Sequence, residues 1–178
     1  MAVILYYIEI PVVAFYKLDL STLPAILAGF AMGPAQGACV VVIKNLVHML
    51  GTSTACVGEL ADIIMSSCFV VPASLIYARR KDRRGALYAL MAGTALIAVS
   101  GALTNYFLLI PAYQTLMNLP LEAIVGMGQA VLPFVDSAAK LVIFITLPFY
   151  VLKGAALSVV TWLLYKRVSP LLHEERGR

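Results

Sequence analysis

The sequence has 178 residues, of which 62% are hydrophobic and 12% are charged, and its formal net charge is +4. The mean hydropathy of +0.93 is too high for a water-exposed globule, so the composition excludes a soluble domain and predicts an integral membrane protein. A chain of this length accommodates one compact bundle, so we expect a single transmembrane domain over residues 1–178.

Six hydrophobic segments are predicted to be the helices of an all-α bundle. They cover residues 1–16, 23–32, 34–50, 59–77 and 85–110, and a stretch within 138–168. The Gly33–Pro34 pair separates the second and third segments and favours a short, tilted or partly buried helix before it. Irregular backbone at membrane depth survives only inside protein or beside a cavity, so this break indicates a binding site.

The last segment contains Pro148, a residue favoured in the first turn of a helix, where its missing N–H would be unpaired anyway. We therefore expect the final helix to start near Pro148 and to reach Val168. Residues 121–147 then form an outer segment that is part helix and part loop, and a longer, kinked span is the alternative. Five spans instead of six is the alternative count, because the first segment is short.

Two basic clusters predict the orientation. They contain most of the 13 Lys and Arg residues: Arg79, Arg80, Lys81, Arg83 and Arg84 in the first, and Lys166, Arg167, Arg176 and Arg178 in the second. Lys and Arg in short loops are retained on the cytoplasmic side. Both clusters should therefore lie on that side, and six spans place both termini in the cytoplasm.

Charged groups at membrane depth are costly and usually face a cavity or a partner. The candidates are Glu9, Lys44, Glu59, Asp62, Lys140 and Lys153, with Asn45 and Asn105 as uncharged companions. The expected topology brings Asp19, Glu59, Asp62, Asn105 and Lys153 towards the outer half of the bundle. Contacts that only join helices are the alternative, but the whole set predicts a polar and aromatic pocket that opens outward.

No enzymatic constellation is present. The sequence has no HExxH, GxSxG or P-loop motif, and Cys39, Cys56 and Cys68 lack metal-ligand spacing. We therefore expect no catalytic residues, no metal and no cofactor. Without a nucleotide-binding motif, active uptake would require a partner that hydrolyses ATP.

Five sequence blocks resemble the riboflavin-specific substrate-binding S component of energy-coupling factor (ECF) transporters. They are KLDLSTLPAILAGFAMGPAQG (17–37), IKNLVHML (43–50), GELAD (58–62), NYFLLIPAY (105–113) and PFYVLKG (148–154). The likeness covers nearly the whole chain in order. It implies a six-helix protein of the prokaryotic plasma membrane that binds one vitamin near its outer face, beneath a loop that follows the first helix.

The resemblance also implies partners and contacts. The protein would join a transmembrane coupling protein and two ATPases, and Asn105 and Lys153 would contact riboflavin, the transported ligand. An Asn amide donates to and accepts from the flavin's pyrimidine edge at once, and Lys adds a charged donor. The expected substrate-binding residues are Asn105, Lys153, Tyr150, Asp19, Glu59, Asp62 and Leu18.

One departure from the family pattern keeps alternatives open. The family commonly has Asn where this chain has Tyr150, and Tyr does not reproduce the amide's pair of hydrogen bonds. An S component for a different vitamin is therefore the first alternative. A non-transporting scaffold subunit, whose buried polar groups only join helices, is the second.

Overall fold

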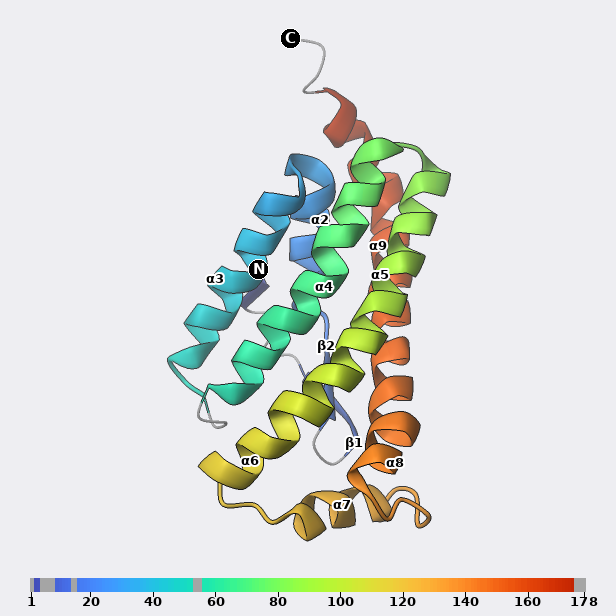
Figure 1. The fold of residues 1–178 in the computed structure, drawn as a ribbon. Coiled ribbons are helices and arrows are strands. Elements are labelled where there is room, and N and C mark those ends of the chain that lie inside the picture. Colours follow the sequence, from blue (N-terminus) through green and yellow to red (C-terminus); the bar gives the residue numbers. More distant parts are fainter. Residues whose placement is uncertain (1, 4–8, 14–15, 53–55, 175–178) are drawn as a thin grey trace.

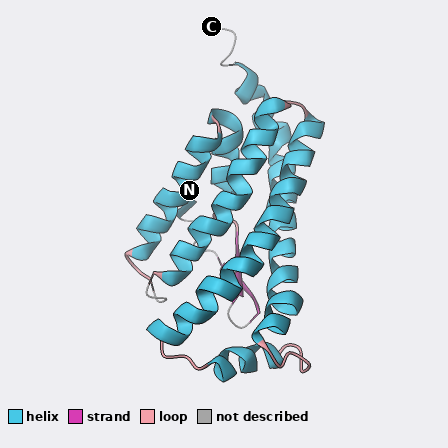
Figure 2. Ribbon diagram, in the orientation of Figure 1, coloured by secondary structure: helices cyan, strands magenta, loops and turns pink. Residues whose placement is uncertain are grey.

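The computed structural model describes residues 2–3, 9–13, 16–52 and 56–174. Most of these residues are helical, and the helices pack side by side in an elongated bundle (Figures 1 and 2). The described residues form six helices, which is the predicted number. They are α2 (Leu23–Met32), α3 (Pro34–Met49), α4 (Val57–Arg79), α5–η1–α6 (Arg83–Thr104, Asn105–Leu109 and Ile110–Leu116), α7 (Leu121–Gln129) and α8–η2–α9 (Ala138–Leu141, Val142–Thr146 and Leu147–Glu174). Five of them correspond to predicted segments, and the sixth is α7 rather than a helix over residues 1–16.

Three of the described helices are long and apolar enough to cross a membrane. They are Val57–Arg79, the continuous helix Arg83–Leu116 and the stretch Ala138–Leu164. In the described part of the chain, α4 packs against α5, α5 packs against α9, and α3 packs against α2 and α4. This arrangement places the carboxyl-terminal end of α5 and the start of α9 at the same end of the bundle (Figure 1).

The predicted break between the second and third segments is confirmed. Helix α2 ends at Gly33, whose φ of 112° lies in the region that favours glycine, and α3 begins at Pro34. Glycine also permits a close approach inside this pair of helices, because a Cβ at Gly37 would lie 3.0 Å from the Ala25 carbonyl oxygen. The two short helices therefore pack as a tight unit against α4.

The first segment differs from the prediction. We expect a helix over residues 1–16, but its described part contains strand β1 (Glu9–Val13), which pairs antiparallel with β2 (Tyr16–Asp19). Pro11 disfavours a helix interior, and the surrounding β-branched and aromatic residues favour an extended backbone. The hairpin places the end of β2 beside α9. Residues 1, 4–8 and 14–15 lie outside the described residues.

The start of the last helix also differs from the prediction. The helix begins after Ser137, whose side chain caps the N–H of Lys140, and Pro148 lies inside it. The π-turn η2 ends at Thr146, and the N–H of Leu147 donates to the carbonyl oxygen of Val142. This wider turn lets the helix continue past a proline. The longer span that the sequence left open is therefore correct, and only residues 121–137 form the predicted mixture of helix and loop.

The other long helix also contains a π-turn just before a proline. The π-turn η1 spans Asn105–Leu109, and the N–H of Ile110 donates to the carbonyl oxygen of Asn105 immediately before Pro111. The two π-turns contact each other. π-turns in helices are frequent at functional positions, and here one of them begins at a residue that the sequence assigns to the binding site.

The two ends of the bundle differ in charge. The exposed turn Arg79–Arg84 and the carboxyl-terminal end of α9 lie at one end, whereas α6 and α7 lie at the other (Figure 1). The expected placement of both basic clusters on one side is confirmed for these residues. Arg176 and Arg178 lie outside the described residues.

Candidate functional site

Polar side chains from five elements meet inside the bundle. They come from β2, the turn that follows it, α3, α4 and α9, and each is at most 7% exposed. The members of this set, called the polar cluster below, are Asp19, Ser21, Thr22, Lys44, Asn45, Asp62, Ser66 and Lys153. Burial of so many polar groups in an apolar bundle is costly unless they pair with one another or with a ligand.

Lys153 joins the last helix to the end of the hairpin. Its Nζ lies 2.7 Å from Oδ2 of Asp19 and 3.9 Å from Oδ1 of Asp62. Asp19 also accepts hydrogen bonds from the backbone N–H, at 2.9 Å, and from the hydroxyl of Ser21. Burial is the largest single influence and raises the pKa of the Asp19 carboxyl, but the charges of Lys153 and Lys44 and the hydrogen bond from Lys153 together lower it by more, so this pKa lies below its ordinary value. Asp19 is therefore a carboxylate at neutral pH.

Asp62 is the second centre of the polar cluster. Its Oδ2 lies 2.9 Å from the Lys44 ammonium and accepts a hydrogen bond of 2.9 Å from Asn45. Its Oδ1 accepts from Ser66 at 3.1 Å. The Lys44 ammonium also donates a hydrogen bond of 2.7 Å to the hydroxyl oxygen of Ser21. Two carboxylates and two ammonium groups therefore balance their charge within one connected network.

The Asn45 amide has unused hydrogen-bonding capacity. Its nitrogen donates to Asp62 and to the carbonyl oxygen of Val41, both at 2.9 Å. Its fully buried Oδ1 has no hydrogen-bond partner among the described residues. Buried acceptors are nearly always satisfied, so a water or a donor from a ligand is the natural partner for this atom.

Asn105 and Tyr150 meet beside Gly101. The amide nitrogen of Asn105 donates to the carbonyl oxygen of Gly101 at 2.8 Å. A Cβ at Gly101 would lie 2.5 Å from the Tyr150 ring, so glycine is required for this close packing. The Tyr150 side chain hydrogen-bonds Asn105 and lies close enough to Lys153 for a direct electrostatic interaction. The π-turn η1 and helix α9 thus bring both residues next to the polar cluster.

Glu59 forms a separate pair. It lies nearly one turn before Asp62 on α4, and its Oε1 is 2.7 Å from Nδ1 of His48 on α3. The Glu59 side chain is buried, whereas the His48 side chain is 19% exposed. This pair ties α3 to α4 at the edge of the polar cluster.

The structure thus brings together most of the predicted site residues. Asp19, Asp62, Lys153, Asn105 and Tyr150 lie within one buried region, and Glu59 lies at its edge. Leu18 is on strand β2, but its side chain lies outside the described part.

Sequence reasoning missed several partners of these residues. Lys44 and Asn45 were recognisable only as polar residues in an apolar helix, and were not assigned to the site. For the hydroxyl partners, the sequence offers one usable signal. Ser66 lies four residues after Asp62, so the two share one helix face. Among the described residues, no group of three or more His, Cys, Asp or Glu side chains is arranged to hold a metal ion.

Comparison with known proteins gives a consistent result. The family described as "ECF transporter, substrate-specific component" matches residues 1–165. The chain is 28% identical to the riboflavin transporter FmnP of Bacillus subtilis, covering 92% of this chain and 82% of that protein. It is 29% identical to the riboflavin transporter RibU of Staphylococcus aureus, covering 96% of this chain and 86% of that protein.

A solved structure is also similar. It is described as the S component of a bacterial ECF transporter, and it superimposes with a TM-score of 0.73 at 27% identity. The match covers 97% of this chain and 90% of the other.

Proposed function

This chain belongs to the substrate-specific components of ECF transporters, and we propose that its substrate is riboflavin. As a member of that family it is a multi-pass membrane protein that binds a substrate, pairs with the energising module and is not an enzyme. The observation that carries the riboflavin proposal is the meeting of Asn105 and Tyr150 with Lys153, a member of the polar cluster. These residues come from the two motifs that most resemble the riboflavin members.

The chemistry of these groups suits a flavin. Its pyrimidine edge carries an N–H between two carbonyl groups, and the Asn105 amide accepts from the first and donates to the second. The Lys153 ammonium supplies a charged donor to a carbonyl oxygen or a ring nitrogen. Apolar and aromatic walls around these groups would pack against the tricyclic ring.

Ligand binding must change the contacts seen here. Lys153 is 5% exposed and pairs with Asp19, which lies at the end of the β1–β2 hairpin. A flavin carbonyl that reaches Lys153 therefore shares this ammonium with Asp19 or replaces it. Binding and the position of the end of β2 are coupled for this reason.

Fluorescence quenching tests the proposal. Purified protein in detergent should quench riboflavin fluorescence with one site per chain, and thiamine or biotin in large excess should not displace the ligand. Concentrative uptake into vesicles should require the coupling protein and the two ATPases as well. Saturable binding of another vitamin without riboflavin binding would instead support the first alternative, which the Tyr150 departure motivates.

Replacing Tyr150 with Asn restores the usual family residue and should preserve or strengthen riboflavin binding. The same change removes a ring that is 5% exposed and packed on Gly101, so it should lower stability by roughly 2–4 kcal/mol. Tyr150→Phe is the matched control, because it keeps the packing and removes only the hydroxyl. A severe loss of binding in Tyr150→Asn but not in Tyr150→Phe would show that the ring itself holds the flavin.

We also propose that the basic end of the bundle is cytoplasmic. Positive loops are retained on that side, so a Cys at position 82, in a variant without Cys39, Cys56 and Cys68, should resist membrane-impermeant thiol reagents in intact cells. Thr115→Cys in the same background is the control, because Thr115 is exposed on α6 at the other end. Efficient labelling at position 82 but not at position 115 would show that the basic end faces outward, which contradicts the proposal.

A further inference from the structure

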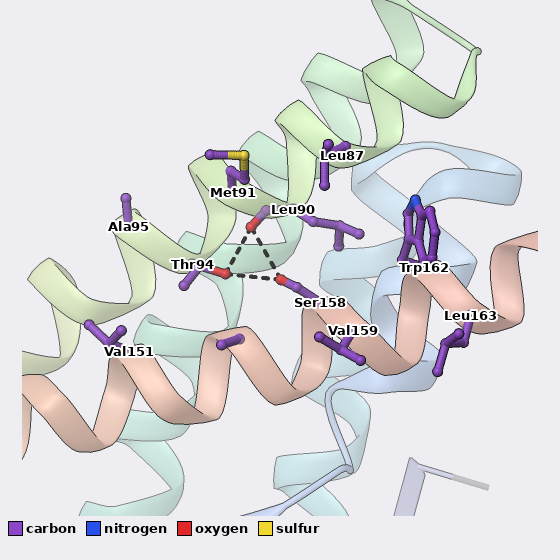
Figure 3. A pocket seen from close by; sticks show the side chains of 11 residues that line it. Leu87, Leu90, Met91, Thr94, Ala95, Val151, Ser158, Val159, Trp162 and Leu163 are labelled. Carbon is purple, nitrogen blue, oxygen red and sulfur yellow. Dashed lines mark hydrogen bonds between the residues drawn. The ribbon is translucent and has the colours of Figure 1, made fainter.

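An apolar groove runs along the outside of the bundle between α5 and α9 (Figure 3). Its volume is about 680 Å³. Exposed side chains from both helices form its walls: Leu87, Met91 and Ala95 from α5, and Val159, Trp162 and Leu163 from α9. The groove is separate from the polar cluster and opens towards the surroundings of the bundle, which for a membrane protein are lipid.

The polar side chains among the described lining residues of the groove are Thr94, Ser158 and Trp162. Thr94 and Ser158 hydrogen-bond each other at 2.9 Å, and both lie within hydrogen-bonding distance of the carbonyl oxygen of Leu90 (Figure 3). At Gly154 the two helices come so close that a Cβ would lie 2.9 Å from the Thr94 methyl group. The groove carries no charged side chain among its described lining residues, and its walls are predominantly apolar, so the occupant that fits is a hydrocarbon chain.

The length of the groove matches one leaflet of a bilayer. Its α9 wall runs from Val151 to Leu163, which is about 18 Å along a helix that rises 1.5 Å per residue. Half of a hydrocarbon core about 30 Å thick is about 15 Å. An extended acyl chain of a phospholipid therefore fits along the groove within a single leaflet.

The groove leads to the basic end of the bundle. Leu87 lies four residues after Arg83 and three after Arg84, so the α5 wall and these arginines share one helix face. Both arginines belong to the exposed turn Arg79–Arg84. A headgroup held at this end meets several positive charges, which complement the phosphate of an anionic lipid.

We propose that the groove between α5 and α9 binds one acyl chain of an anionic phospholipid, whose headgroup pairs with Arg83 and Arg84. The hydrocarbon walls hold the chain, and the arginines select the headgroup. This site is independent of riboflavin and of the polar cluster.

Trp162 provides a direct probe, because it is the chain's single tryptophan and lines the groove. The protein is placed in phosphatidylcholine vesicles that contain a small fraction of phosphatidylglycerol with brominated acyl chains. The reverse mixture carries the bromine on the phosphatidylcholine. With a contribution of roughly 1 kcal/mol per basic residue, brominated phosphatidylglycerol should quench Trp162 as if its local fraction were about five- to thirtyfold enriched.

Two variants separate the headgroup from the acyl chain. Arg83→Gln with Arg84→Gln should abolish the enrichment, and it leaves the Asp82 cap of α5 in place. Lys140→Gln, at the other end of the bundle, should leave the enrichment unchanged. Ala95→Phe fills the groove and should reduce the enrichment, whereas Leu103→Phe, on an exposed position of α5 outside the groove, should not.

The outcomes decide the proposal. Equal quenching by both brominated lipids in the parent protein would show ordinary lipid contact and overturn it without any variant. Enrichment that survives Ala95→Phe would place the headgroup at the basic turn without the acyl chain in the groove, which also overturns the proposal. If the purified coupling protein shields Trp162 and the parent shows no lipid preference, the groove is a protein-docking face instead.

Discussion

Replacing Asp62 with Asn is expected to lower the free energy of unfolding by about 3–5 kcal/mol, the usual cost of breaking a buried ion pair from one side. Asp62 is 7% exposed, and its carboxylate lies 2.9 Å from the Lys44 ammonium. It also accepts from Asn45 and Ser66. The variant retains a hydrogen-bonding side chain but removes the negative charge that faces Lys44 and, at 3.9 Å, Lys153.

Unfolding in detergent mixtures of increasing SDS content, followed by circular dichroism, measures this effect. Asp136→Asn is the matched control, because Asp136 forms an ion pair of 2.6 Å with Lys140 but both side chains are exposed. Surface ion pairs of this kind contribute little to the free energy of unfolding, so the control should unfold like the parent. If Asp62→Asn unfolds at the same SDS fraction as Asp136→Asn, the polar cluster does not hold the bundle together.

The helices that the sequence predicted best are those with unambiguous local signals. Helix α2 has the predicted bounds, because Pro24 stands in its first turn and Gly33 ends it. Helix α4 exceeds the predicted 59–77 by two residues at each end. Hydropathy and breaker residues are properties of the local sequence, so reading them required no knowledge of the packing.

The main errors in the predicted helix boundaries all involve proline: the end predicted at Ile110, before Pro111, the start predicted near Pro148, and the helix predicted over residues 1–16, which contain Pro11. Pro148 favours a first helical turn, where its missing N–H would be unpaired anyway, so the sequence predicts a helix start there. The structure instead continues the helix through a π-turn just before this proline, and that π-turn contacts η1 from a distant part of the chain. Ser137, which caps the true start, was the available signal. Pro11, in contrast, lies in strand β1, where the sequence predicts a helix.

The composition of the candidate site was more predictable than its pairing. A charged residue in an apolar segment indicates a functional or paired group, because burying a charge in the membrane costs free energy. This criterion predicts Asp62 and Lys153 as site residues. Their partners depend on which helix faces meet. Lys44 pairs with Asp62 because α3 packs on α4, and Lys153 pairs with Asp19 because β2 ends beside α9. No sequence spacing specifies these contacts between distant parts of the chain.

Replacing Lys153 with Met is expected to weaken riboflavin binding about tenfold to a hundredfold. A hydrogen bond from a charged group contributes roughly 1.5–3 kcal/mol, and 1.4 kcal/mol corresponds to one factor of ten. Asn105→Ala should have a smaller effect, because a hydrogen bond between neutral groups contributes about 0.5–1.5 kcal/mol. Lys140→Met removes a lysine at an exposed position and should bind riboflavin like the parent.

A second variant separates lost binding from lost folding. Lys153→Met leaves the Asp19 carboxylate buried without the ammonium 2.7 Å away, so part of its effect could be unfolding. Combining it with Asp19→Asn removes both charges of the pair and should restore the unfolding transition towards that of the parent. The double variant should nevertheless bind riboflavin at least tenfold more weakly than Asp19→Asn alone, as measured by fluorescence quenching. If the double variant folds and binds like Asp19→Asn, Lys153 serves only to hold the end of β2, and the flavin's polar edge lies elsewhere.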